Sequence, residues 1–218
     1  MEIKACIFDL DGTLLNTLTT ITYYVNRSLK AAGAQTICEE VCRTLIGKGA
    51  RNLLERALKA VGHEVDDFEA FFRDYDDTYN ASPDYLTEPY PGMVELVSSL
   101  KAKGIRIAVL SNKPEGAVRP LVEKFFGDTV DVLFGGKPGV PLKPNPDAVA
   151  PVLSALGLSA AETAFIGDSG VDMQTAKNYG AAKAIGVLWG YRDEAELSAC
   201  GADALAETPD DILRALKI

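Results

Sequence analysis

The sequence has few of the residues that bind structural metals. Its 218 residues include one histidine, His63, and four cysteines, Cys6, Cys38, Cys42 and Cys200. Cys38 and Cys42 are four apart and can share a helical face, but a zinc site needs further ligands. We therefore expect no zinc site and no structural disulfide. Reduced thiols and a cytoplasmic location are the simpler interpretation.

Basic residues and long apolar runs are also scarce. The chain has 22 Lys and Arg against 31 Asp and Glu, a formal net charge of -9. It lacks the broad basic surface that binding to a phosphate backbone requires, so we expect no nucleic acid partner. No apolar stretch approaches the roughly 18 residues of a membrane span, and we expect no membrane association. Residues 1–10 lack the basic start of a signal peptide.

Short apolar runs that end abruptly in turn residues predict buried strands. Five runs fit this pattern, the last more weakly: residues 3–8, 105–110, 163–166, 184–188 and 130–134. Helical patterns lie between them, at residues 91–103, 114–126, 147–156 and 172–179. This alternation predicts an α/β fold, a Rossmann-like doubly wound parallel sheet with helices on both faces.

Residues 15–88 have a different pattern. They contain no convincing strand, and four helical patterns follow one another at residues 17–32, 38–45, 51–60 and 66–79. Prolines then mark the return to the α/β alternation. We predict a core domain of residues 1–14 and 89–218 and an all-helical cap domain of residues 15–88. The hinges are expected near residues 15–18 and 87–90.

Polar residues follow several of the predicted strands. In parallel sheets, ligands bind beyond the carboxyl ends of the strands. Asp9, Asp11, Ser111, Asn112 and Asp168 stand at such ends and are expected around one crevice. One acid after a strand is usually a turn residue, but several that converge indicate a functional site.

The segment that begins at Asp9 fits phosphoryl transfer. Asp9 can attack a bound phosphorus in line with the leaving oxygen. Asp11, two residues on, can give that oxygen a proton and later take one from the attacking water. Gly12 allows a tight turn. Alone, the segment also fits a strand followed by an ordinary Asp-Gly turn.

Carboxylates beside a phosphate need positive charge nearby. Asp168 adds an oxygen ligand, and such a site suits Mg²⁺. Lys143, on a loop with two prolines, can neutralise the nucleophile and the phosphoryl oxygens. Ser111 and Asn112 are small donors for a phosphoryl oxygen.

Asp172 lies four residues after Asp168, on the same face of the next predicted helix. It can orient the metal ligands or Lys143. It can equally be a first-turn acid that favours the helix dipole.

Together these segments resemble the four motifs of the haloacid dehalogenase superfamily. The matches, in the family's order, are residues 9–14 (DLDGTL), 111–114 (SNKP), 143–144 (KP) and 167–169 (GDS) with Asp172. The resemblance implies a nucleophile at Asp9, an acid/base at Asp11, and phosphate contacts from Ser111 and Lys143. It also implies Mg²⁺ on Asp9, Asp168 and the backbone carbonyl of Asp11.

The helical insertion resembles the C1 cap of that superfamily. Residues 47–58 (GKGARNLLERAL) and the SNKP segment are similar to phosphoglycolate phosphatases. This resemblance implies hydrolysis of a small phosphorylated metabolite, 2-phosphoglycolate above others. Lys48 and Arg51 are candidates for contacts with its carboxylate, although they also fit a solvated helix start. Asn16 stands where the family commonly has Asp, which bears on the cap hinge and not on the chemistry.

Relatives with other chemistry can be compared with these motifs. Haloacid dehalogenases proper and phosphonatases lack an aspartate at the Asp11 position, which argues against both reactions. Phosphatases for pyrophosphate or a sugar phosphate stay open, as do a β-phosphoglucomutase-like phosphotransferase and a catalytically silent binding module. The sequence also leaves open the oligomeric state and the choice between Mg²⁺ and Mn²⁺.

Overall fold

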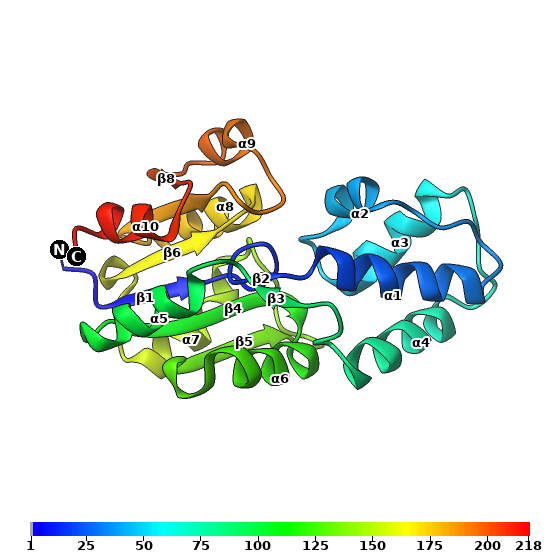
Figure 1. Ribbon diagram of the computed structural model, residues 1–218, viewed down its shortest axis with the longest axis horizontal. Helices are drawn as coiled ribbons and strands as arrows, with labels where there is room; N and C mark the ends of the chain where they lie inside the picture. The colour runs from blue at the N-terminus through cyan, green and yellow to red at the C-terminus, as the bar shows by residue number, and fades with distance from the viewer. Residues whose placement is uncertain (1) are drawn as a thin grey trace.

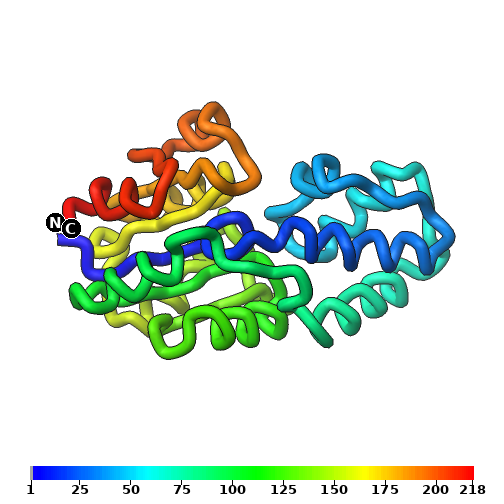
Figure 2. The backbone as a smooth tube through the Cα atoms, viewed as in Figure 1, coloured from blue at the N-terminus to red at the C-terminus, as the bar shows by residue number. Residues whose placement is uncertain are grey.

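Two bodies make up the protein, which a computed structural model describes over residues 2–218 (Figure 1). One is a parallel sheet with helices on both faces, and it carries both ends of the chain. The other is a group of helices at the opposite end of the molecule. Figure 2 shows that the chain leaves the sheet after its first strand, runs through the helical body and returns. The predicted α/β core with an inserted helical cap is confirmed.

Among these residues, six strands form the main sheet in the order β5-β4-β1-β6-β7-β8, and all neighbours are parallel. The strands are β1 Ala5–Phe8, β4 Arg106–Pro114, β5 Val132–Gly136, β6 Thr163–Gly167, β7 Lys183–Val187 and β8 Ala204–Ala206. In β1, Cys6 and Phe8 pack into one apolar core, and Ala5 and Ile7 pack into another. The strand is apolar throughout because helices cover both faces of the sheet.

Each face of the sheet has its own set of helices. The set on the Phe8 face is α5 Met93–Ala102, α6 Glu115–Phe126 and α10 Pro209–Leu216. The set on the Ile7 face is α7 Ala150–Leu156, α8 Gly170–Tyr179 and α9 Glu194–Ala199. None of the helices described in residues 2–218 combines the length and the apolarity needed to cross a membrane.

The helical body has a core of its own. Its helices are α1 Leu18–Ala31, α2 Glu39–Leu45, α3 Ala50–Ala60 and α4 Phe68–Ala81. Their apolar side chains form one buried cluster, which also takes in Ala117 of α6 and Tyr191. The two bodies therefore touch through apolar side chains as well as through the connecting chain.

A short antiparallel ribbon joins the two bodies. In it, β2 (Leu15–Asn16) pairs with β3 (Glu88–Pro89). The sequence patterns predict no strand here, because two-residue strands are too short to show an alternation of apolar and polar side chains. The Asn16 side chain accepts a hydrogen bond from the backbone N–H of Leu18 at 3.4 Å. The predicted domain boundaries fall at this ribbon and stay a prediction.

Two further parts of the core differ from the prediction. The sequence places the end of the second main strand at Leu110, but the extended backbone of β4 continues to Pro114. Ser111 and Asn112 therefore belong to the strand and not to a loop after it. The last part of the sheet, β8 with α9 and α10, lies in residues for which the sequence predicts no element.

Candidate active site

The three central strands bring the predicted acids together. β1 lies between β4 and β6, with Phe8 opposite Val109 on one side and Ile166 on the other. Asp9 follows β1 directly and Asp168 follows β6, so both leave the sheet at its carboxyl edge. The sequence-distant motifs therefore meet at one edge, as the rule for parallel sheets predicts.

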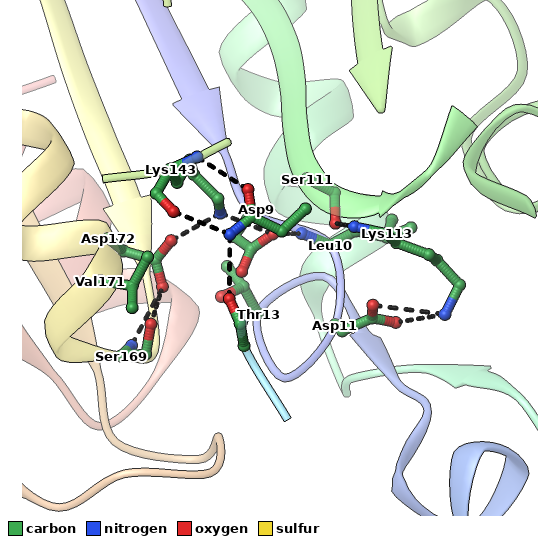
Figure 3. A network of polar contacts seen from close by, with 12 residues as sticks. Asp9, Leu10, Asp11, Thr13, Ser111, Lys113, Lys143, Ser169, Val171 and Asp172 are labelled. Carbon is green, nitrogen blue, oxygen red and sulfur yellow. Dashed lines mark hydrogen bonds and ion pairs between the residues drawn. The ribbon is translucent and has the colours of Figure 1, made fainter. Parts of the chain in front are cut away.

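Lys143 lies between two carboxylates on one side of this edge (Figure 3). Its Nζ is 2.9 Å from Asp9 Oδ1 and 2.6 Å from Asp172 Oδ1, and its side chain is buried. Burial alone would lower the pKa of Lys143, but attraction to Asp172 and Asp9 outweighs it and raises the pKa. For Asp9, burial is the largest effect and raises the pKa to about 7, although Lys143 opposes it. Lys143 is therefore a fixed cation beside the Asp9 carboxylate.

Asp168 is buried and tightly held. The hydroxyl of Thr13 donates to its Oδ1 at 3.2 Å, and the backbone N–H of Tyr191 donates to its Oδ2 at 2.8 Å. A Cβ atom added at Gly12 would lie 2.3 Å from Oδ2 of Asp168, and one added at Gly190 would lie 2.2 Å from Cβ of Asp168. Burial, with repulsion from Asp172 and Asp9, raises the pKa of Asp168 well above its usual value. Two glycines therefore let the backbone close around this carboxylate.

The carboxylates fit a divalent cation. Asp9, Asp168 and Asp172 each offer an oxygen, and these oxygens lie within 4.8 Å of one another. Three carboxylates with one ammonium, that of Lys143, leave an excess of two negative charges. Carboxylate oxygens are the ligands that Mg²⁺ prefers. Both oxygens of Asp172 already have partners, Lys143 and Ser169, and both oxygens of Asp168 accept hydrogen bonds as well.

Asp11 is held on the other side of Asp9. The hydroxyl of Thr17 donates to its Oδ1 at 2.7 Å and is itself 2.9 Å from the Tyr191 hydroxyl. Lys113 Nζ lies 3.0 Å and 3.3 Å from the two carboxylate oxygens of Asp11 (Figure 3). The same ammonium lies 4.4 Å from the centre of the Tyr79 ring. Asp9 and Asp11 therefore face different lysines.

The structure brings both Ser111 and Asn112 to the cavity, and it holds the Asn112 amide on backbone groups. Asn112 Oδ1 accepts from the backbone N–H of Lys143 at 2.8 Å. Its Nδ2 donates to the carbonyls of Lys143 and Gly47, at 3.0 and 2.9 Å. The Asn112 amide thus ties the Lys143 loop and the cap to β4, and its donation to a phosphate stays a prediction. The Ser111 hydroxyl accepts from the Lys113 N–H at 3.2 Å and keeps its own proton to donate.

A small cavity lies between the two bodies, above these residues. Its volume is about 60 Å³, whereas ligand sites usually measure about 300–1,000 Å³. Asp9, Asp11, Ser111 and Asp168 line it from the core, with apolar and aromatic side chains of the cap opposite, among them Ile21, Leu53, Tyr75 and Tyr79. The cap therefore lies close over the acids and leaves a space smaller than most ligand sites.

Lys48 and Arg51 do not reach this cavity. Lys48 is exposed. The guanidinium of Arg51 forms two hydrogen bonds with Glu69, at 2.8 and 2.7 Å, and lies over the rings of Phe68 and Phe72. The side chains of Lys48 and Arg51 therefore do not line the cavity in this arrangement, and their contact with a substrate carboxylate stays a prediction. The Gly-rich segment does line the cavity, but through Gly47, Gly49 and Ala50.

Sequence reasoning missed Lys113 and Arg192, both of which line the cavity. Lys113 is only 8% exposed. One signal for it was available: in an extended segment, residues two apart point to the same side, so Lys113 accompanies Ser111. Arg192 lies outside the four motifs. Its Nη1 and Nη2 donate to the carbonyls of Arg43 and Ile46, at 2.8 and 2.9 Å.

Known proteins are similar to this chain in sequence and in fold. Residues 6–187 match the family described as haloacid dehalogenase-like hydrolase. The phosphoglycolate phosphatase of Rhodospirillum rubrum is 34% identical over 198 residues, covering 88% of this chain and 82% of that one. That of Vibrio parahaemolyticus is 32% identical over 227 residues, covering 100% and 97%.

A solved structure agrees with these sequence relatives. The crystal structure of a predicted phosphoglycolate phosphatase from Haemophilus somnus superposes with a TM-score of 0.90 at 27% identity. The superposition covers 99% of this chain and 98% of that one. The sequence match alone spans most of the chain and includes Asp9, Asp11, Lys143 and Asp168. The chain therefore belongs to the haloacid dehalogenase-like hydrolase family.

Proposed function

We propose that the protein is a magnesium-dependent phosphatase that hydrolyses 2-phosphoglycolate through an aspartyl-phosphate on Asp9. The observation that carries the proposal is the placement of Asp9. Its carboxylate lies at the cavity, 2.9 Å from a buried lysine and two residues before a second cavity-lining carboxylate. A candidate nucleophile and a candidate acid/base thus line one space, with a buried cation beside the nucleophile. The relatives named phosphoglycolate phosphatase support the choice of substrate.

In the first step, a carboxylate oxygen of Asp9 attacks phosphorus, and the bond from phosphorus to the ester oxygen breaks. The leaving oxygen takes a proton from Asp11. Lys143, held between Asp9 and Asp172, stabilises the negative charge on the phosphoryl oxygens. The Ser111 hydroxyl donates to one of them. A Mg²⁺ ion on Asp9, Asp168 and the Asp11 carbonyl would neutralise the remaining charge.

In the second step, water attacks the phosphorus of the aspartyl-phosphate, and Asp11, now ionised, takes the proton of that water. The bond between phosphorus and Asp9 breaks, which frees phosphate and restores the carboxylate. The closed cap limits the water that reaches the intermediate. The cap that we assign to residues 15–88 therefore has a part in the chemistry.

Phosphate release from four substrates tests the proposal: 2-phosphoglycolate, pyrophosphate, glucose 6-phosphate and 4-nitrophenyl phosphate. Wild type, Asp9→Asn and the control Asp147→Asn are assayed with Mg²⁺ and with EDTA; Asp147 is exposed and does not line the cavity. We expect 2-phosphoglycolate to be preferred, and activity to be lost in EDTA and in Asp9→Asn only. Preference for another substrate overturns the substrate assignment. Conversion of glucose 6-phosphate to an isomeric sugar phosphate, without release of free phosphate, overturns hydrolysis. No metal-dependent release from any substrate overturns the proposal as a whole.

A further inference from the structure

Lys113 is a buried cation for which the proposed reaction has no use. It lies in β4 and is 8% exposed. Its ammonium contacts the Asp11 carboxylate at 3.0 and 3.3 Å and the face of the Tyr79 ring at 4.4 Å. Burying an ammonium is costly unless it is paired. A buried cation that reaches a cavity is therefore a candidate for binding an anion there.

The position of Lys113 relative to Asp11 says which part of a substrate it would meet. Asp11 is placed to protonate the leaving oxygen, so that oxygen sits beside Asp11 and the phosphoryl group lies toward Asp9 and Lys143. Lys143 and Lys113 approach from opposite sides (Figure 3). Lys113 is thus on the side of the leaving group, and a group attached near the leaving oxygen would come within its reach.

The chemistry of a phosphorylated 2-hydroxy acid matches this spacing. Its carboxylate carbon is two single bonds, roughly 2.5 Å, from the leaving oxygen. An oxygen of that carboxylate can therefore meet an ammonium that lies 3.0 Å from Asp11. Aliphatic side chains of the cap, such as Ile21 and Leu53, form much of the opposite wall. In apolar surroundings an ion pair is stronger than in water.

Other cations at the cavity are less suited to this task. Among the described residues that line it, only Lys113 and Arg192 are basic. Arg192 already donates to two cap carbonyls and lies 3.5 Å from a carboxylate oxygen of Glu196. Lys48 and Arg51, which the sequence favoured, lie outside the cavity. Lys113 is the remaining cation with an anionic partner inside the space.

We propose that Lys113 determines substrate specificity by binding the carboxylate next to the scissile phosphate ester, so that the site selects small phosphorylated 2-hydroxy acids. This inference rests on the proposed phosphatase function. A carboxylate in this place competes with Asp11 for Lys113. Binding of the correct substrate therefore draws the ammonium away from the group that must donate a proton to the leaving oxygen.

Two substrates that differ only at this position test the inference. 2-Phosphoglycolate carries the carboxylate, and 2-hydroxyethyl phosphate carries a neutral hydroxymethyl group in its place. In Lys113→Met, we expect kcat/KM for 2-phosphoglycolate to fall by about 100-fold, chiefly through KM, because a desolvated charge pair is lost. We expect the value for 2-hydroxyethyl phosphate to fall far less, because this compound offers no anion to the ammonium and loses only the effect of Lys113 on Asp11.

Control variants separate charge recognition from other effects. Lys113→Arg keeps the charge and should retain most of the preference. Lys177→Met removes an exposed lysine that pairs with Asp203 on the core, and it should change neither substrate. An equal loss for both substrates in Lys113→Met would show that Lys113 serves only to position Asp11, which overturns the inference. If Lys113→Met does not fold, Lys113→Gln, which can still donate to Asp11, replaces it.

A binding measurement distinguishes this inference from the proposed function. Calorimetry with Asp9→Asn, which cannot form the intermediate, measures affinity for the same two compounds with and without Lys113→Met. Affinity for 2-phosphoglycolate that depends on Lys113 supports the subsite even if the wild type shows no turnover, and in that case the proposed function alone fails. Affinity that does not depend on Lys113 overturns the inference, whatever the turnover.

Discussion

A side chain on Gly12 would collide with the buried carboxylate of Asp168. A Cβ atom at Gly12 would lie 2.3 Å from Asp168 Oδ2, and Gly12 has φ +84°, which disfavours any other residue. Gly12 immediately follows Asp11 in the chain. This one glycine therefore sets the distance between the first motif and the last.

We expect Gly12→Ala to lose at least about 100-fold in activity, because a shift of about 1 Å at a catalytic group can cost that much. Gly33→Ala is the matched control: Gly33 has φ +76° and no atom within 4 Å of an added Cβ. Both variants should lose about 1–2 kcal/mol of unfolding free energy from the left-handed backbone, and Gly12→Ala should lose more because its Cβ atom also collides with Asp168. Kinetics and urea denaturation check this, and equal activities in the two variants would contradict it.

The sequence predicts the core of this site well, for a physical reason. Strands covered on both faces are apolar throughout, so the polar residues that end them stand out, as Asp9 and Asp168 do. Lys143 is predicted because an anionic site needs a cation. What the sequence misses depends on tertiary contacts. Arg51 is drawn away by Glu69, which lies in another helix.

For Asn112 and Lys113 as well, the sequence does not reveal the tertiary contacts of the side chains. Both are polar residues of one motif and both line the cavity, but their chemistry alone does not say which contacts each side chain makes. In the structure, the Asn112 amide forms hydrogen bonds with the backbone of Lys143 and Gly47. The β2–β3 ribbon is missed for another reason, since a pair of two-residue strands carries no periodic signal.

The pH dependence of stability should report the buried carboxylate of Asp9. Burial, with repulsion from Asp172 and Asp11 and against the attraction of Lys143, raises its pKa from 3.8 to about 7. Between these values, the folded protein keeps a proton that the unfolded chain has released. The stability that the neutral carboxyl contributes is therefore complete below its ordinary pKa and is lost as the pH rises through 7.

Thermal unfolding in EDTA, from pH 4 to pH 8, checks this for wild type and Asp9→Asn. The asparagine stands in for the neutral carboxyl at every pH. We expect similar Tm values for the two proteins at pH 4 and a higher Tm for Asp9→Asn at pH 8. A difference between them that does not change with pH would contradict the assignment.

The cysteines should divide into reactive and unreactive thiols. Burial raises the pKa of Cys6 to about 12 and is the largest of the effects that raise that of Cys42 to about 11. Both are buried, whereas Cys38 is exposed. Because the thiolate is the reactive form, iodoacetamide at pH 8 should modify Cys38 rapidly in the native protein. Cys6 and Cys42 should be modified only in denaturant, as peptide mass spectrometry would record; native labelling of either would contradict their burial.

Arg192 lines the cavity and joins the two bodies. It comes from the core side, next to Tyr191, whose N–H binds Asp168. Its guanidinium donates to the carbonyls of Arg43 and Ile46, at both ends of the last turn of α2. Because each of these hydrogen bonds has a charged donor, each contributes more than a neutral one. We infer that Arg192 helps to hold the cap closed.

Arg192→Ala should therefore favour the open cap. We expect KM to rise about tenfold, in line with the loss of one to two such hydrogen bonds, and limited proteolysis within residues 15–88 to accelerate. Arg192→Lys should have a KM between those of wild type and Arg192→Ala, because an ammonium lacks the planar fork that spans two carbonyls. Arg214→Ala is the control, since the exposed Arg214 of α10 pairs with the half-buried Asp211, at the end of the core far from the cap. The Mg²⁺ concentration for half-maximal activity should stay unchanged in Arg192→Ala. If it rises together with KM, the substitution has disturbed Asp168 through Tyr191, and the loss of the hydrogen bonds to the cap is not the cause.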